Sequence, residues 1–302
     1  MDVRHLELLR ELSERGSVTA AARATHRTPS AVSQQLKIAQ REFGMTLVEP
    51  AGRGVRLTEA GRLLADGAST VAAAIEQVQA RWDAYRGEPS GTVTITALPS
   101  AATFLLAEVM SDLASTEIRL ECSDVDIAEA EFAGLAADHD IVIAHSLTGV
   151  RPAGADGLTV VPLAQEPLDV AMAADHPLAG VAAVRAADVV DREWIGVPLG
   201  YPFDTVLHMI EQVTGAELTI DQRLRDNRLV ESLVRVSHRI AILPRFTTPT
   251  DSGIVLKELT DIPSARHISA VLRPDRAERL AVQRVLLALR HVASEVERRH
   301  RQ

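Results

Sequence analysis

The sequence is 302 residues long, 46% of its residues are hydrophobic, and its formal net charge is −9. This length predicts two or three domains, and the apolar fraction is ample for packed cores, so we expect a globular protein. The single cysteine, Cys122, excludes an intramolecular disulfide and a thiolate zinc cluster. The start has no apolar leader and no run reaches about 18 apolar residues, which predicts a cytoplasmic protein without a membrane span.

The charge is unevenly distributed along the chain. Residues 1–57 carry nine basic and six acidic side chains, a net of +3, which leaves −12 for the remainder. From Arg15 to Arg41 there are five Arg or Lys residues and no acid. An acid-free basic window is typical of a surface that faces phosphates, so one small module is expected to touch nucleic acid.

Three short helices are predicted at the start of the chain. Apolar residues recur at helical spacing within residues 2–15, and residues 17–26 form a second short segment rich in alanine. A third helix at residues 28–42 begins at Thr28, whose hydroxyl can cap it, and ends before Gly44. Two helices joined by a tight turn make a helix-turn-helix.

The third helix has two different faces. Three apolar residues at helical spacing are expected to face inward: Val32, Leu36 and Ala39. The outward face carries Ser30, Ser33, Gln34 and Lys37. Glutamine can pair with adenine, serine reaches bases or phosphates, and lysine supplies charge, so this face predicts contact with DNA. The alternative is a solvated helix pair in an all-α domain, and the spacing and charge together argue against it.

A small β-wing is predicted after the third helix. Two short apolar segments, at residues 47–48 and 55–57, surround a glycine-rich tip. Arg53 at the tip and Arg56 beside it are well placed for phosphate or the minor groove. An ordinary solvated hairpin is the alternative.

A long helix follows, with Thr58 as its cap, and reaches Tyr85. Its apolar residues alternate steps of four and three, which is a heptad seam: Leu64, Ala68, Val71, Ile75, Val78, Trp82 and Tyr85. Such a seam implies a partner helix, and its own copy in a second subunit predicts a dimer. Packing against the protein's own second domain is the alternative.

The same alternation of strands and helices follows twice after a hinge at residues 86–91. The first copy has strands at 92–97, 118–122 and 140–144 and helices at 101–114 and 127–137. The second has strands at 194–197, 218–224 and 240–243 and helices at 203–214 and 227–236. Two more strands, 158–165 and 168–173, cross between the copies, and a closing helix spans 276–299. This order predicts two like-wound α/β lobes, with Cys122 as a buried structural thiol.

Ligands of such lobes bind outside the carboxyl ends of parallel strands, where helix N-termini point free N–H groups. Ser100 is expected to cap one such helix, and the segment around Tyr201 fills the matching position in the second lobe. The expected ligand-contacting residues are Pro99, Ser100, Thr103, His145, Leu199 and Tyr201. A plain cap at Ser100 and a structural role for His145 are the alternatives.

These positions leave the charge of the ligand open. Helix N-termini favour an anion such as a carboxylate. An amine would instead be bound by the acids predicted near the strand ends, Asp124, Asp126, Asp226 and Glu231. Asp126 also fits a capping box with Glu129.

The order of these parts resembles the LysR-type transcriptional regulators over almost the whole chain. Three separated segments carry the resemblance: Gly16 to Ala22, Pro29 to Leu36, and Gly54 to Gly61. It implies a winged helix-turn-helix at 1–57, a linker and dimerisation helix at 58–87, and at 91–302 an effector-binding domain like the periplasmic binding proteins. Lobe I would comprise about 91–163 and 268–302, and lobe II about 164–267.

The resemblance also assigns roles to single residues. It implies that the third helix lies in the major groove and that the wing meets the backbone, through Thr28, Pro29, Ser30, Ser33, Gln34, Lys37 and Arg53. Ser100, Thr103 and Tyr201 would fall in or near the effector pocket, which typically binds a carboxylate or an amino acid. At residues 237–239 the family often has glycines, and we hypothesise that His238 and Arg239 narrow the cleft here or replace backbone contacts to the ligand.

The prediction is therefore an α+β multidomain regulator that binds double-stranded promoter DNA and a small-molecule effector as a homodimer or a dimer of dimers. The alternative is a cytoplasmic small-molecule-binding module without a specific DNA target, against which residues 1–57 argue. The sequence has no nucleophile with a base, no phosphate loop and no His/Cys cluster of metal spacing. An enzyme, a cofactor and a metal are therefore not expected.

Overall fold

The computed structural model describes residues 2–52, 54–87 and 89–300. They form two compact units, which we call the small unit (Met1–Gly87 with Arg273–Leu280) and the large unit (Glu88–Leu272 with Ala281–Gln302). Within the described residues, no helix combines the length and the apolar character that crossing a membrane requires.

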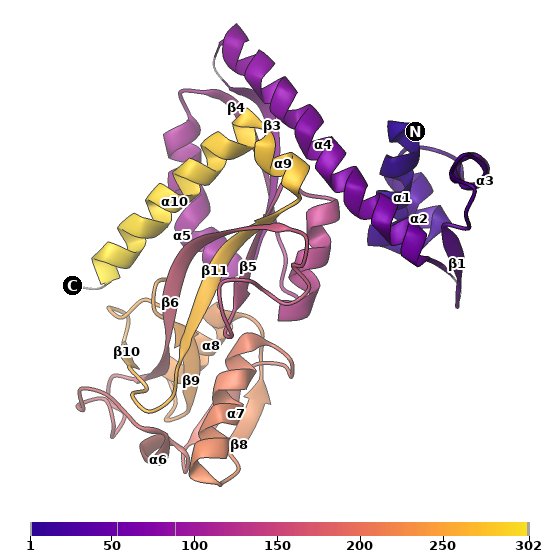
Figure 1. The fold of residues 1–302 in the computed structure, drawn as a ribbon. Helices are drawn as coiled ribbons and strands as arrows, with labels where there is room; N and C mark the ends of the chain where they lie inside the picture. The colour runs from indigo at the N-terminus through magenta and orange to yellow at the C-terminus, as the bar shows by residue number, and fades with distance from the viewer. Residues whose placement is uncertain (1, 53, 88, 301–302) are drawn as a thin grey trace. The chain divides into compact units, whose positions relative to one another are not determined.

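The small unit begins with three helices and a two-stranded wing (Figure 1). Its elements are α1 (Val3–Arg15), α2 (Val18–Ala24), α3 (Pro29–Phe43), β1 (Val48–Ala51) and β2 (Gly54–Leu57). Thr28 caps α3 by accepting the Ala31 N–H at 3.2 Å, and Gly44 ends the helix in the left-handed conformation. One core joins the helices and the wing: Leu8, Leu9, Leu12, Ala21, Ala22, Val32, Leu36, Ala39, Leu47, Leu57 and Ala65. The predicted winged helix-turn-helix is confirmed.

Two glycines allow the wing and the following helix to approach the rest of the unit. The Val55 N–H donates to the Gly16 carbonyl oxygen at 2.9 Å, and a Cβ on Gly54 would lie 2.3 Å from that same oxygen. A Cβ on Gly61 would lie 2.1 Å from the Leu47 carbonyl oxygen. Only glycine fits at these close backbone contacts, since any other side chain would push the segments apart.

The long helix α4 (Glu59–Arg86) begins at Thr58, whose hydroxyl accepts the Gly61 N–H at 3.1 Å. In the first part of the predicted heptad seam, Ala68 is buried and Leu64 and Val71 are half-buried. Its later residues are exposed, with 51% of Ile75, 66% of Val78, 54% of Trp82 and 84% of Tyr85 accessible to solvent. In the described part of the chain, the second half of α4 therefore presents an exposed apolar stripe.

The large unit is built on one mixed sheet of nine strands in the described chain, in the order β4-β3-β5-β11-β6-β9-β7-β8 with β10 beside β6. The first lobe has parallel β3 (Ser90–Ala97), β4 (Glu117–Asp124) and β5 (Ile141–Ser146). The second has parallel β7 (Glu193–Gly196), β8 (Thr219–Arg223) and β9 (Ile240–Pro244). Antiparallel β6 (Thr159–Ala173) and β11 (Ala265–Leu272) join them, so the two predicted α/β lobes are confirmed.

Helices cover the sheet and connect its strands (Figure 1). They are α5 (Pro99–Leu113), the 3-10 helix η1 (Glu129–Ala137), α6 (Ala186–Val189), α7 (Pro202–Thr214), α8 (Asn227–Arg235) and α10 (Leu280–His300). The remaining strand, β10 (Ile254–Lys257), pairs with β6.

Several predicted elements differ from the observed ones. The two predicted strands at 158–165 and 168–173 are one strand, β6, because Pro167 continues it in register opposite Ala265. The predicted helix at 127–137 is the 3-10 helix η1. Ala128 rather than Asp126 precedes it, so the expected capping box with Glu129 does not form. No strand was predicted at β10 or β11.

The predicted closing helix at 276–299 is wrong in its first turn. The backbone at Arg279 is extended, which separates a short helix α9 (Pro274–Glu278) from α10. Since α9 belongs to the small unit and most of α10 to the large one, the break lies near the boundary between the two units, which the local sequence does not mark.

Cys122 lies on the predicted strand, but the expectation that it is buried is wrong. It is exposed, because β4 is the edge strand of the sheet and its second half is exposed from Glu121 to Asp124. An edge strand lacks a neighbouring strand on one side, so its residues can be exposed to solvent even where the sequence pattern predicts burial.

Candidate functional site

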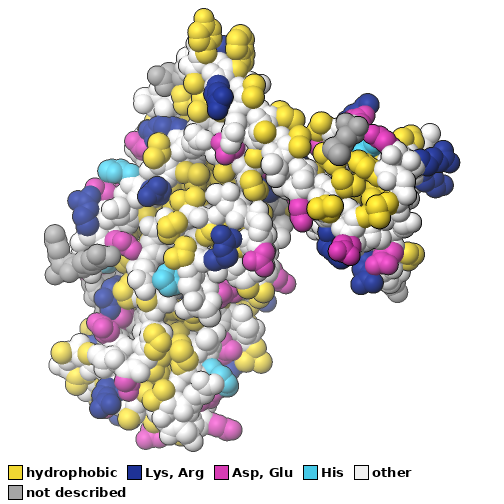
Figure 2. Space-filling view, in the orientation of Figure 1, with side chains coloured by type: hydrophobic (Ala, Val, Ile, Leu, Met, Phe, Trp, Pro, Cys, Tyr) yellow, Lys and Arg dark blue, Asp and Glu magenta, His cyan; other side chains and the backbone are white. Residues whose placement is uncertain are grey.

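The four residues predicted to face outward from α3 are polar and include no acid. Ser30, Gln34 and Lys37 are exposed and Ser33 is half-buried, whereas Val32, Leu36 and Ala39 are buried. Lys and Arg side chains gather at the outer edge of the small unit, over the region of α3 (Figure 2). Such a helix can contact nucleic acid with its polar face while its buried face stays packed in the core of the unit.

The turn before α3 holds contacts that the sequence did not reveal. His26 adopts φ +53°, within the left-handed region, and the Arg27 N–H donates to the Ala22 carbonyl at 2.8 Å. Arg27 also donates to the Gln35 side chain, which in turn donates to the Arg4 carbonyl at 2.8 Å. Gln35 therefore fastens α3 to α1, while Gln34 beside it remains exposed.

The wing is a two-stranded hairpin in which Arg56 pairs with Glu49, with 2.7 Å between Nε and Oε1. This ion pair partly neutralises Arg56, because the carboxylate lies on the neighbouring strand. Arg53, the other wing residue expected to meet the DNA backbone, lies outside the described residues.

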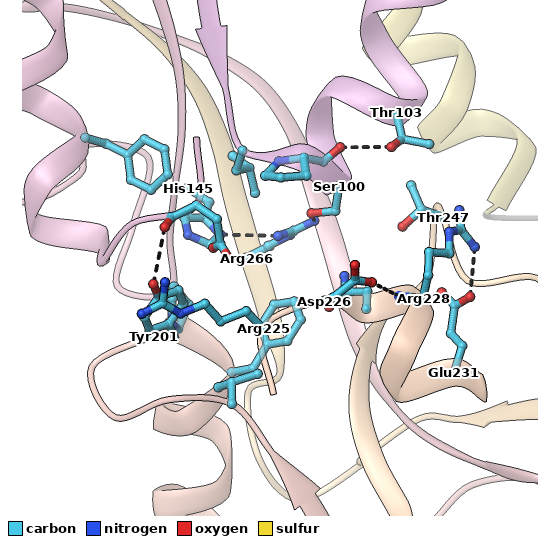
Figure 3. Close-up of a pocket in the computed structure, with 18 residues that line it drawn as sticks. Ser100, Thr103, His145, Tyr201, Arg225, Asp226, Arg228, Glu231, Thr247 and Arg266 are labelled. Atoms are coloured by element: carbon cyan, nitrogen blue, oxygen red, sulfur yellow. Dashed lines mark hydrogen bonds and ion pairs between the residues drawn. The ribbon is translucent and has the colours of Figure 1, made fainter. Parts of the chain in front are cut away.

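The large unit contains a cavity of about 320 Å³ where its two lobes meet (Figure 3). It lies at the carboxyl ends of parallel strands, and the N-terminal turns of α5, α7 and α8 reach it. The lining residues are Leu98, Pro99, Ser100, Thr103, Asp126, Phe132, His145, Val197, Tyr201, Pro202, Phe203, Arg225, Asp226, Asn227, Arg228, Glu231, Thr247 and Arg266.

Five of the six expected ligand-contacting residues line this cavity: Pro99, Ser100, Thr103, His145 and Tyr201. Leu199 does not line it, since it lies in the loop before α7 with 73% of its surface exposed. Ser100 does not cap α5, because the helix begins one residue earlier and Leu98 occupies the cap position. The Ser100 hydroxyl is therefore available for another contact.

A buried ion pair that the sequence did not reveal lies at the inner end of the cavity. Arg266 on β11 and Glu166 on β6 are 1% and 0% exposed. Arg266 donates to Glu166 Oε2 from Nε at 2.8 Å and from Nη2 at 2.5 Å. It also donates to Ser100 Oγ at 2.8 Å and contacts His145 Nδ1 at 3.2 Å.

His145 is almost completely buried beside this arginine. Burial and, to a smaller extent, the positive charge of Arg266 lower the pKa of His145 well below its usual value of 6.5. The imidazole is therefore neutral at physiological pH. The Phe132 ring meets it edge to face, with 5.5 Å between ring centroids.

The charged side chains from α8 and the segment before it have partners within the protein. Asp226 caps α8 by accepting the Arg228 and Leu229 N–H groups at 2.8 and 3.1 Å. Arg228 pairs with Glu231 at 2.8 Å, and the Arg225 guanidinium lies over the Tyr201 ring at 5.4 Å. Residues 225–228 follow β8. Asp226 was expected near this strand end, and the rule that placed Ser100 could also have found Arg225, Asn227 and Arg228.

Of the four acids expected near strand ends, Asp126, Asp226 and Glu231 line the cavity, whereas Asp124 ends β4 without lining it. The hypothesis that His238 and Arg239 narrow the cleft is wrong, because neither residue lines the cavity. The Arg239 side chain pairs with Asp221 at 3.1 Å, and the His238 ring lies near that of His176. Both residues precede β9, whereas the cavity is reached beyond the far end of that strand, at Thr247.

The described geometry defines a class of protein that combines a winged helix-turn-helix with a two-lobed ligand-binding unit. Family comparisons agree with this class. Residues 3–62 match the bacterial regulatory helix-turn-helix protein, lysR family, and residues 86–294 match the LysR substrate binding domain. The chain belongs to the LysR family of transcriptional regulators.

Its similarity to individual proteins extends over nearly the whole chain. It is 25% identical to the DNA-binding transcriptional dual regulator OxyR of Escherichia coli (strain K12) over 293 residues, covering 96% of this chain and 95% of that protein. It is 25% identical to the transcriptional dual regulator GltC of Bacillus subtilis (strain 168) over 280 residues, covering 92% of each.

Solved structures share the fold. A full-length OxyR variant from Pseudomonas aeruginosa superposes with a TM-score of 0.66 at 17% identity, covering 96% of this chain and 95% of that one. ArgP from Mycobacterium tuberculosis gives a TM-score of 0.63 at 19% identity, with 97% and 98% covered. CbnR solved with its target DNA gives 0.53 at 19% identity, with 97% and 100% covered.

Proposed function

We propose that this regulator recognises a specific promoter sequence through α3 and that a small molecule bound between the lobes of the large unit modulates its activity. The polar, acid-free face of α3 carries this proposal, because Ser30, Gln34 and Lys37 are exposed on the side opposite the core. A protein that only bound a small molecule would not need a helix-turn-helix with such a face.

Each side chain on this face has a proposed role. Gln34 and Ser30 read base edges, and Lys37 contacts phosphate. Thr28, Pro29 and Ser33 complete the contact surface at the start of α3, and Arg53 extends it to the backbone from the wing. The similarity in fold to CbnR, which was solved with its target DNA, supports this assignment.

The chain is proposed to act as a homodimer through α4. The exposed stripe of Ile75, Val78, Trp82 and Tyr85 is continuous along one helix and too apolar to remain in water at low cost. A second copy of α4 offers the matching stripe, and two dimers could pair into a tetramer. As a regulator of promoter DNA the protein would act in the cytoplasm.

The cavity between the lobes is the proposed effector site. It receives residues from both lobes, so a bound molecule would stabilise one relative position of the lobes over others. That differential affinity would be the source of regulation, because a ligand shifts an equilibrium only as far as its affinities for the two states differ.

The proposal can be tested with full-length protein and DNA. The duplex that lies upstream of the protein's own reading frame and a scrambled duplex of equal length would be titrated at two salt concentrations. We expect a salt-dependent complex that is much tighter with one genomic sequence than with the scrambled control. Equal, weak binding to every genomic sequence tried would contradict the proposal.

A further inference from the structure

The polar stripe on α3 extends beyond Lys37 to Arg41, which was not among the residues expected to contact DNA. Ser30, Gln34, Lys37 and Arg41 follow one another at steps of four, three and four residues. Residues with this spacing lie on one face of a helix. All four side chains are exposed. The face proposed to meet DNA therefore continues for one further turn.

An open hollow of about 370 Å³ lies at this end of the stripe, between the last turns of α3 and the segment that leads into the wing. Its lining residues are Lys37, Gln40, Arg41, Gly44, Met45 and Thr46. Two of the six carry a positive charge and none carries a negative charge. The hollow is therefore cationic, although the protein as a whole has a net charge of −9.

The protein does not neutralise the two cations of the hollow. Within the described residues, neither Lys37 nor Arg41 has an ion-pair or hydrogen-bond partner. Arg56 of the wing, by contrast, is paired with Glu49 at 2.7 Å. Two like charges four residues apart on a helix repel each other. An anion bound between them would relieve this repulsion and accept hydrogen bonds from both.

Gln40 adds a donor whose direction is set by the fold. Its Oε1 accepts the Leu47 N–H at 2.9 Å, so the amide nitrogen Nε2 is the free end of the side chain. In the described part of the chain this nitrogen has no acceptor, and the exposed Thr46 hydroxyl has no partner. The hollow therefore offers four side-chain donors and no carboxylate.

The length of α3 places the hollow beyond the base-reading residues. Its 15 residues span about 22 Å, whereas the major groove is about 12 Å wide. A recognition helix reads base edges with its N-terminal residues. Arg41 lies seven residues after Gln34, about 10 Å further along the helix axis. At that distance its side chain is expected to meet the sugar-phosphate backbone at the edge of the groove.

We propose that this hollow binds one phosphate of the DNA backbone and thereby fixes the position of α3 in the groove. We call it the phosphate hollow, and its four donors are Lys37, Gln40, Arg41 and Thr46. The inference rests on the proposed recognition of DNA by α3 and adds a contact beyond the base edges. A phosphate presents negative charge and several acceptor oxygens at one point, which matches donors that surround one hollow. Such contacts set register without reading sequence.

The salt dependence of DNA binding tests the charge of the hollow. With the full-length protein, Arg41→Ala should weaken binding to specific and scrambled duplexes alike, by at least about threefold. It should also reduce the slope of log affinity against log salt by about 1 per bound subunit. Arg290→Ala is the matched control, because Arg290 is exposed on α10 of the large unit and has no partner among the described residues. A slope that Arg41→Ala leaves unchanged would overturn the proposal.

Gln40→Glu separates phosphate binding from a merely structural role. The substitution keeps an oxygen that can accept the Leu47 N–H, but it replaces the free donor with a negative charge. We expect an unchanged melting temperature and at least about tenfold weaker binding to either duplex, because a phosphate would meet a like charge. If Gln40 only fastens the turn after α3, the variant will bind DNA as the unmodified protein does, and that result would overturn its assignment.

Uncharged methylphosphonates, placed one at a time along a selected duplex, locate the phosphate itself. The unmodified protein should lose affinity at one phosphate of each half-site at which Arg41→Ala shows no further loss. At the other sensitive phosphates both proteins should lose affinity alike. The same pattern of sensitivity in both proteins would show that Arg41 contacts no phosphate.

These results are distinguishable from failure of the proposed sequence recognition. A reduced slope for Arg41→Ala on scrambled DNA supports the phosphate hollow even if no genomic fragment is selected, which would contradict base reading alone. Selection of a specific fragment, with the slope and the methylphosphonate pattern unaltered in Arg41→Ala, would overturn the phosphate hollow alone.

Discussion

Arg273 and Asp275 form a buried ion pair within the small unit, with 3.1 Å between Nη2 and Oδ2. Two acids of α1 lie beside the same guanidinium, Glu11 at 3.5 Å and Glu14 at 3.4 Å. Arg10 reaches Asp275 from the same helix at 3.3 Å. The segment that carries α9 is therefore fixed to the first helix of the chain by a cluster of alternating charges.

Removing the central arginine of this cluster should destabilise the small unit. Arg273→Met leaves Asp275, Glu11 and Glu14 close together with less positive charge, and losing one partner of a buried pair costs about 3 kcal/mol or more. Urea unfolding followed by circular dichroism would measure the change. Arg298→Met, at an exposed pair on α10, is the control, and an equally small effect of both substitutions would show that the cluster contributes little.

Stability should fall in mild acid because of His145. Its pKa in the folded protein lies well below the usual 6.5, so below that pH the unfolded chain binds a proton that the folded protein does not. The stability that the neutral His145 contributes is thus lost as the pH falls below the usual histidine pKa of 6.5. Comparing urea unfolding of the unmodified protein with His145→Asn isolates this residue. Identical pH dependence in both proteins would contradict the expectation.

The two lysines of the sequence provide a matched pair for DNA binding. Lys37 is exposed on α3, while Lys257 lies on β10 of the large unit. Lys37→Ala should weaken binding to specific and scrambled duplexes alike and reduce the slope of log affinity against log salt by about 1. Lys257→Ala should change neither quantity. An unaltered slope for Lys37→Ala would remove this residue from the phosphate-contacting surface.

Dimerisation should depend on the exposed stripe of α4. Val78→Asp places a charge in the middle of the stripe and should shift the chain toward monomer in analytical ultracentrifugation, with a dissociation constant raised at least about tenfold. Val236→Asp alters an apolar residue of similar exposure, 79%, in the large unit and should leave the association unchanged. A purified protein that is monomeric without any substitution would contradict α4 pairing.

The features that the sequence predicts best are those set by residue spacing or by near neighbours in the chain. The inward spacing of Val32, Leu36 and Ala39 and the caps at Thr28 and Thr58 are set by neighbours within a few residues, and the structure agrees with them. The paired lobes were also predictable, because a strand and a helix of ordinary length recur twice.

The inner end of the cavity could not be predicted in this way. Glu166 and Arg266 are 100 residues apart, and each is a charged residue in a strand, which ordinarily indicates an exposed position. Their burial follows from the pairing of β6 with β11, a contact between distant segments. The expectation for Leu199 failed because a residue beside a helix N-terminus can also point into solvent.

The central claim, that α3 reads a DNA sequence, is tested most directly by selecting genomic fragments with the purified full-length protein. The unmodified protein should enrich a small set of fragments with a shared motif, and Gln34→Ala should relax the preference at one or two positions of that motif at a cost of about 1–3 kcal/mol. Enrichment of no fragment above the unselected pool, or the same motif with the same preference for Gln34→Ala, would contradict the assignment of α3 and Gln34.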